Sequence, residues 1–138
     1  MITPDIFYVE DDPDYAFIIE HIVMKVDDTL TIKIITNGKE AMDVLMGILE
    51  TNKKPKLILL DFNLPGLSGY ELIKKIRGIP FLNNVPVLMF TTANNPKDIK
   101  MCLDAGANEY IIKLAGYTNL VELVQSICER WLGVAAIK

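Results

Sequence analysis

Five polar side chains stand at or just beyond the ends of apolar runs, where they could do chemistry together. Glu10 and Asp11 end the run IFYVED, and Asp61 ends LILLD. Thr91 ends VLMFT, and Lys113 ends YIIK. If these runs are parallel strands of one sheet, their carboxyl ends open on the same edge. The carboxylates, the hydroxyl and the ammonium would then share one pocket.

Such a cluster of carboxylates calls for a cation. Two carboxylates about 4 Å apart repel by roughly 4 kcal/mol at the effective dielectric of a protein surface. Oxygen ligands favour Mg²⁺, which keeps several of its waters and stays open to a phosphate. Phosphoryl transfer depends mainly on positioning and on neutralising charge, and an ionised carboxylate attacks without a general base. The residue types therefore predict a Mg²⁺-dependent phosphoryl-transfer site.

The elements that must position these side chains alternate regularly. Strand-like runs recur at 6–9, 31–35, 57–61, 87–91 and 109–112, with helical patterns between them. This alternation predicts an α/β fold whose parallel sheet is covered by helices on both faces. The third and fourth runs are apolar throughout, as strands buried on both faces are, whereas LTIKIIT alternates and is typical of an edge strand.

Cap residues indicate where the helices begin. Ser, Asp and Asn are preferred at the residue before a helix, and Pro is favoured at its first position. On this basis four helices are predicted to begin at the pairs Asp12-Pro13, Asn37-Gly38, Ser68-Gly69 and Asn95-Pro96. The last helix is predicted to begin at Thr118-Asn119 and to run from about Leu120 to Trp131.

Length and charge exclude several classes of protein. The 138 residues are most simply one domain spanning residues 1–138. The chain has 14 basic and 18 acidic residues, a net charge of −4 and no Lys/Arg block, so we expect no nucleic-acid binding. No apolar run approaches the ~20 residues that a bilayer needs, and MITPDIF lacks a signal-peptide pattern. We therefore expect a cytoplasmic protein that does not bind membranes.

Four strings resemble, in order and spacing, the signature of the receiver domains of bacterial two-component response regulators. They are VEDDP, LLDFNLPGLSG, PVLMFTT and EYIIK. The resemblance extends over essentially the whole chain. It implies a flavodoxin-like (βα)5 fold, a doubly wound five-stranded parallel sheet in the order 2-1-3-4-5. It also implies a stand-alone response regulator, a phosphoprotein of a phosphorelay whose only catalysis is its own phosphorylation and dephosphorylation.

The resemblance implies a phosphoacceptor and a set of metal ligands. Asp61 is similar to the aspartate that attacks the phosphohistidine of a sensor histidine kinase and becomes an acyl phosphate. Glu10 and Asp11 resemble the acidic pair that holds Mg²⁺ together with Asp61 and the backbone carbonyl of Asn63.

The resemblance also implies a switch. Thr91 is similar to the hydroxyl that turns inward to the phosphoryl oxygens, Lys113 to the lysine that pairs with the phosphate, and Tyr110 to the aromatic residue that moves with the hydroxyl. Two residues depart from the family pattern. Leu114 follows Lys113 where the family usually has Pro, so we expect the loop at 114–117 to take its own path. Thr92 follows Thr91 where the family usually has a smaller residue, and is expected to restrict access to the phosphoryl group.

These departures and the ending ERWLG are similar to the stand-alone regulators that serve phytochrome-type and other hybrid sensor kinases. The expected partners are therefore a sensor histidine kinase of that kind and a downstream protein for which the sequence carries no signature. With no effector domain expected, the signal should leave through a surface. We expect a homodimer through the fourth helix, the fifth strand and the fifth helix.

Two other functions are compatible with parts of this pattern. A degenerate receiver would act only as a docking module, although all the side chains of the predicted pocket are present. A haloacid-dehalogenase-type phosphohydrolase also uses a strand-end Asp with Thr, Lys and Mg²⁺. That class needs an acid two residues after its nucleophile, where this chain has Asn63.

Overall fold

Strands and helices alternate along the whole chain. A computed structural model describes residues 3–135. The strands begin and end within one residue of the predicted runs. In chain order the elements are β1 (Ile6–Val9), α1 (Pro13–Val26), β2 (Ile32–Ile35), α2 (Gly38–Leu49), β3 (Leu57–Leu60), α3 (Gly69–Arg77), the 3-10 turn η1 (Pro80–Leu82), β4 (Val87–Thr91), α4 (Pro96–Asp104), β5 (Glu109–Ile112) and α5 (Tyr117–Leu132).

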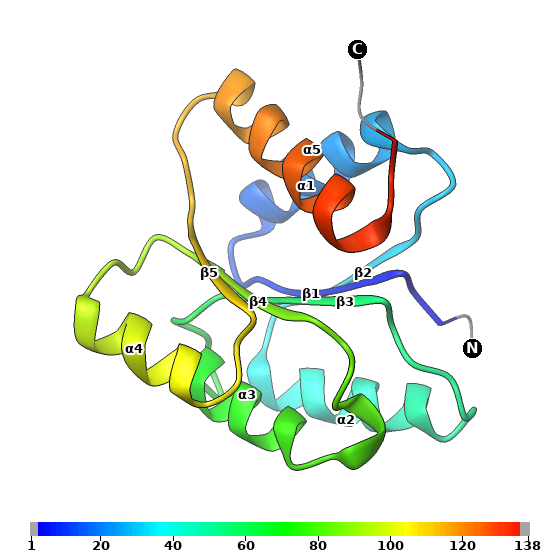
Figure 1. Ribbon diagram of the computed structural model, residues 1–138, viewed down its shortest axis with the longest axis vertical. Coiled ribbons are helices and arrows are strands. Elements are labelled where there is room, and N and C mark those ends of the chain that lie inside the picture. Colours follow the sequence, from blue (N-terminus) through cyan, green and yellow to red (C-terminus); the bar gives the residue numbers. More distant parts are fainter. Residues whose placement is uncertain (1–2, 136–138) are drawn as a thin grey trace.

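The strands form one parallel sheet in the order β2-β1-β3-β4-β5. Helices α1 and α5 lie on one face, and α2, α3 and α4 lie on the other (Figure 1). This is the predicted flavodoxin-like arrangement. The sequence LTIKIIT, predicted to form an edge strand, contains β2, which lies at one edge with Lys33 exposed. β3 and β4, in the centre, are buried at every position.

Alternate residues of each central strand supply two separate cores. Ile6 and Tyr8 of β1 pack with Phe90 in the core beneath α1 and α5. Phe7 and Val9 of the same strand pack in the core beneath α2, α3 and α4. Each fully buried aliphatic or aromatic side chain stabilises the fold by about 1.5–3 kcal/mol, so both helical layers are fastened to the sheet. The sheet is thereby supported by a packed core on each face.

The predicted cap residues begin four of the helices. The Asp12 side chain accepts hydrogen bonds from the first turn of α1, and Asn37 and Asn95 do the same for α2 and α4. Ser68 and Glu71 form a reciprocal capping box at the start of α3. The helices therefore begin just beyond the strand ends, which keeps the connecting loops short at the edge where the polar residues gather.

The start of α5 differs from the prediction. The helix begins at Tyr117, and its cap is Gly116, which has a φ of 92° and offers no side-chain acceptor. Asn119, predicted to belong to the cap, lies inside the first turn, and its amide donates to the Ala115 carbonyl at 3.0 Å. The prediction was wrong because a glycine in the left-handed region can begin the helix without a side-chain cap. Within residues 3–135, no helix is both long and apolar enough to cross a lipid bilayer.

Candidate functional site

The sheet brings the predicted site residues to its carboxyl edge. Glu10 follows β1, Asp61 follows β3, Thr91 ends β4 and Lys113 follows β5. Backbone hydrogen bonds extend past the strands and fix these positions. The Asp61 amide donates to the Val9 carbonyl at 3.1 Å, and the Lys113 amide donates to the Thr91 carbonyl at 2.9 Å. The convergence predicted from the strand ends is therefore confirmed for these four side chains.

Lys113 lies between two buried carboxylates. Its Nζ is 3.0 Å from Asp61 Oδ2, and it also donates to Glu10 Oε1. The side chains of Lys113, Glu10 and Asp61 are only 7%, 1% and 10% exposed. Leu114 in place of Pro does not move the lysine out of the pocket. Residues 3–135 contain no cis peptide bond, so Lys113 reaches the carboxylates from an all-trans backbone.

Glu10 is held by partners on both of its oxygens. The Tyr8 hydroxyl donates to Oε1 at 2.9 Å, and the Asp12 amide donates to Oε2 at 3.2 Å. Burial raises the pKa of Glu10, and the nearby Asp61 charge adds to this, whereas the Lys113 ammonium opposes it. Glu10 therefore accepts a proton more readily than an ordinary glutamate does.

The pKa of Asp61 is shifted in the opposite direction to that of Glu10. Burial alone would raise its pKa, but interactions with the Thr91 hydroxyl and the Lys113 ammonium outweigh burial, so the pKa lies below its ordinary value. The Asn63 amide approaches Asp61 Oδ1 at 3.4 Å. Asp61 is thus held ionised at neutral pH.

Three of the carboxylates are close enough to share a cation. Glu10, Asp11 and Asp61 each offer one oxygen, and these oxygens lie within 4.8 Å of one another. Glu10 and Asp61 are buried, whereas Asp11 is exposed at the entrance. Asn63, whose carbonyl was predicted to complete the set, stands two residues beyond Asp61 and is also exposed. All the available donors are oxygens, which fits a hard divalent cation.

Thr91 and Tyr110 both form hydrogen bonds with the backbone of Ala93. Thr91 is fully buried, and its Oγ1 accepts a hydrogen bond from the Ala93 amide at 3.2 Å. The Tyr110 hydroxyl donates to the Ala93 carbonyl at 2.7 Å. A movement of the Thr91 hydroxyl away from the Ala93 amide would break the first bond and disturb the second. The two predicted switch residues are therefore mechanically linked.

Two aromatic residues of the pocket were missed by sequence reasoning. Tyr8 hydrogen-bonds Glu10, and the Tyr15 ring lies with its centroid 4.5 Å from Lys113 Nζ. Tyr8 lies within an apolar run, and Tyr15 lies within the amphipathic pattern of the first helix, so each fits an ordinary core position. No signal in the sequence distinguishes them from other core aromatics.

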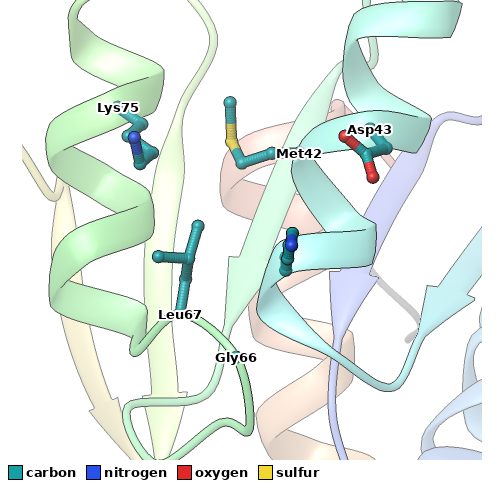
Figure 2. A pocket seen from close by; sticks show the side chains of 6 residues that line it. Met42, Asp43, Gly66, Leu67 and Lys75 are labelled. Atoms are coloured by element: carbon teal, nitrogen blue, oxygen red, sulfur yellow. The ribbon is translucent and has the colours of Figure 1, made fainter.

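A separate hollow lies between α2 and α3, away from these side chains (Figure 2). Met42 and Leu67 form its apolar part, and both basic and acidic side chains line the rest of it. Its lining residues are Lys39, Met42, Asp43, Gly66, Leu67 and Lys75. None of the predicted site residues lines it, so the candidate chemistry belongs to the sheet edge and not to this hollow.

Comparisons with known proteins show which family this chain resembles. The family model described as response regulator receiver domain matches residues 6–125. Response regulator Rcp1 of Synechocystis is 36% identical over 101 residues, which cover 72% of this chain and 69% of Rcp1. The crystal structure of the phosphorylated cyanobacterial phytochrome response regulator RcpA superposes with a TM-score of 0.87 at 33% identity, covering 98% of both chains. The Mn²⁺-bound form of Rcp1 gives a TM-score of 0.78 at 30% identity, covering 98% of this chain and 99% of the other.

Proposed function

Because this chain belongs to the response regulator receiver domain family, we propose that Asp61 accepts a phosphoryl group from the phosphohistidine of a sensor histidine kinase. Receiver domains are the signalling modules of two-component systems, so the family favours a switch over the phosphohydrolase alternative. One observation carries the proposal. Lys113 contacts both Asp61 and Glu10 in a pocket at the carboxyl edge of the sheet.

In the proposed step an Asp61 carboxylate oxygen forms a bond to phosphorus. The phosphorus–nitrogen bond of the phosphohistidine breaks, and its electron pair remains on the imidazole nitrogen. No base is needed, because the lowered pKa of Asp61 keeps its carboxylate ionised. The Lys113 ammonium, already 3.0 Å from Asp61, would pair with the oxygens of the incoming group. The Thr91 hydroxyl would donate to the same oxygens.

Mg²⁺ would be held by Glu10, Asp11, Asp61 and the carbonyl of Asn63. When bound, it neutralises charge on the transferring phosphoryl oxygens. The oxygen-only donor set of Glu10, Asp11 and Asp61 supports this choice. The existence of a Mn²⁺-bound form of the similar protein Rcp1 supports the proposal that this chain binds a divalent cation.

The phosphodonor is proposed to be a phytochrome-type or other hybrid histidine kinase. The likeness to RcpA, a phytochrome response regulator, supports this class. Such a donor places the reaction in the cytoplasm. Small phosphodonors would also serve, because Asp61 and its cation supply the catalysis. Thr92 is exposed beside the pocket and would slow loss of the phosphoryl group to water.

The output is proposed to be self-association through α4, β5 and α5. Thr91 and Tyr110 sense the phosphoryl group and lie on β4 and β5, beside this face. Leu103 of α4 and Ile112 of β5 are exposed apolar side chains that a second copy could cover. Ion pairs between exposed side chains of this face would contribute little to the free energy of dimerisation compared with burial of these apolar side chains. A two-fold axis would bring the same face of both copies together.

The phosphoryl contacts are strong enough to drive such a switch. Moving a population from 1:99 to 99:1 needs about 5.5 kcal/mol of differential stabilisation. Charge-assisted hydrogen bonds from Thr91 and Lys113 contribute roughly 1.5–3 kcal/mol each. Together with a bound cation they reach that value.

Phosphorylation can be tested directly. The protein is incubated with acetyl phosphate and Mg²⁺, and its mass is measured at intact-protein resolution. The wild type should gain one phosphoryl group, Asp61→Asn should gain none, and the control Asp43→Asn on α2 should behave as the wild type. If neither acetyl phosphate nor any histidine kinase of the host phosphorylates the wild type, the docking-module hypothesis would be the one that remains. Steady turnover of small phosphate esters would instead indicate a phosphohydrolase.

The dimer needs its own measurement. Sedimentation velocity with and without beryllofluoride, a phosphoryl mimic, should show a shift from monomer to dimer. Leu103→Glu should bind beryllofluoride normally and remain monomeric, because Leu103 is exposed near the far end of α4, on the proposed contact face and away from Asp61 and Lys113. A wild-type monomer in both states would rule out self-association and leave a different protein as the partner of this face.

A further inference from the structure

Lys113 has aromatic contacts as well as acidic ones. Its Nζ lies 4.5 Å from the ring centroid of Tyr15 and 6.0 Å from that of Phe90. The two rings pack against each other at 5.9 Å with an interplanar angle of 52°. A lysine ammonium within about 6 Å of an aromatic face is attracted by the ring, most strongly when water is excluded. The Lys113 side chain is 7% exposed, so this contact is largely dry.

The chain around Lys113 does little to fix its side chain. β5 ends at Ile112, and Leu114 to Gly116 form an exposed loop before α5. A lysine carries its charge on a flexible four-carbon stem, so its position depends on what surrounds the ammonium. Glu10 and Asp61 attract it, but their charges are the ones that a cation and a phosphoryl group rearrange. The rings of Tyr15 and Phe90 carry no net charge that a cation or a phosphoryl group would neutralise.

We propose that Tyr15 is a positioning residue whose ring holds the Lys113 ammonium at the phosphoacceptor. The proposal rests on the proposed function, because it concerns the lysine that pairs with the phosphoryl group. Tyr15 belongs to the first turn of α1, which the Asp12 side chain caps, so the ring stands on a fixed element. It limits the directions in which Lys113 can leave the pocket while the carboxylate partners change.

Two substitutions of Tyr15 test the contributions of its ring and its hydroxyl separately. The hydroxyl oxygen is buried and has no hydrogen-bond partner among residues 3–135. Tyr15→Phe therefore removes a group without a partner and keeps the aromatic face. Tyr15→Leu keeps an apolar side chain and removes the face. Phe81→Leu is the matched control, because Lys54 Nζ lies 4.8 Å from that ring, far from the pocket.

The test is the affinity for beryllofluoride at saturating Mg²⁺, measured by NMR titration. Tyr15→Leu should bind about tenfold more weakly than the wild type. Tyr15→Phe and Phe81→Leu should stay within about twofold. If Tyr15→Phe loses as much as Tyr15→Leu, the hydroxyl acts and not the ring, and the proposal fails. Equal affinity of Tyr15→Leu and wild type would also overturn it.

A double-mutant cycle separates positioning from general structural support. In a Lys113→Met background, Tyr15→Leu should cause no further loss of beryllofluoride affinity, because the ring then has no ammonium to hold. A further tenfold loss would show that Tyr15 acts only through the fold. A wild type that binds no beryllofluoride would instead contradict the proposed function, so the two failures are distinguishable.

Discussion

Replacing Lys113 by Met removes the cation that contacts two buried carboxylates, and the structure sets the size of the effect. The ammonium lies 3.0 Å from Asp61 Oδ2 and hydrogen-bonds Glu10, with all three side chains nearly inaccessible. Removing one partner of a buried ion pair costs about 3–5 kcal/mol, because the remaining charge keeps its desolvation penalty. A domain of this size is stable by about 5–15 kcal/mol, so the variant should still fold.

The pocket can limit this loss by protonating Glu10, whose pKa burial already raises. Protonating a carboxyl of ordinary pKa 4.5 at pH 7 costs about 3.4 kcal/mol, since each pH unit contributes about 1.36 kcal/mol. A raised carboxyl pKa means that the folded state binds more protons than the unfolded state, so stability increases as the pH falls. The variant should be about 3 kcal/mol less stable than the wild type at pH 7. The difference should be smaller at pH 5 than at pH 7, because protonating Glu10 costs less free energy at the lower pH.

The assay is urea unfolding of both proteins between pH 5 and pH 8 in the presence of a chelator. Lys56→Met is the matched control, because Lys56 pairs with Asp5 at 3.4 Å on the surface. Its effect should stay within about 0.5 kcal/mol at every pH. A Lys113→Met difference that is below about 1 kcal/mol, or that is the same at pH 5 and pH 7, would refute the reasoning.

Three further predictions follow from the pocket and its supporting loop. Asp11→Ala should weaken Mg²⁺ binding at least about tenfold by calorimetry and leave the free energy of unfolding nearly unchanged, because Asp11 is exposed; unchanged affinity would remove it from the ligand set. The affinity for Mg²⁺ should fall as the pH is lowered, first because Glu10, whose pKa is raised, becomes protonated, and only later because Asp61, whose pKa is lowered, does. A Mg²⁺ affinity that does not change between pH 7 and pH 4 would contradict this order. Gly69→Ala should cost about 1–3 kcal/mol in urea unfolding and slow phosphorylation, because the new Cβ would lie 2.2 Å from the Asp61 carbonyl oxygen. Gly78→Ala, whose Cβ would meet its nearest atom at 3.3 Å, should cost much less, and equal losses would show that the crowding at Asp61 is relieved.

The sheet and its polar edge could be predicted because burial on both faces leaves an unambiguous pattern. LILL of β3 and VLMFT of β4 are buried at every position, so their apolar runs end where the sheet ends. Asp61 is the residue after LILL, and Thr91 is the last residue of VLMFT, so each marks the end of its strand. Asp61 and Thr91 could be placed at one edge for this reason alone. The helix starts were equally readable where Asp or Asn precedes a proline, since the side chain and the ring both favour that boundary.

The start of α5 and the aromatic wall of the pocket could not be predicted in this way. Gly116 begins the helix through its backbone conformation, which many loop glycines share. The contact between Tyr15 and Lys113 depends on how α1 crosses the end of the sheet. That crossing is set by packing of α1 against α5 and the strands beneath them. The sequence pattern of a single helix or strand therefore does not predict how α1 crosses the sheet.

Residue type and position alone do not distinguish the two buried carboxylates, to which the family resemblance assigned different roles. Glu10 and Asp61 both follow buried strands, and both contact the same lysine. At Glu10 burial dominates and raises the pKa, whereas at Asp61 the contacts with Thr91 and Lys113 outweigh burial and lower it. Asp61 is consequently the carboxylate that stays ionised, as the proposed attack on phosphorus requires, while Glu10 is expected to take up the proton when the pH falls or the lysine is lost. The difference comes from the side chains that β4 and β5 bring to each carboxylate, so the two roles are assigned by packing rather than by residue type.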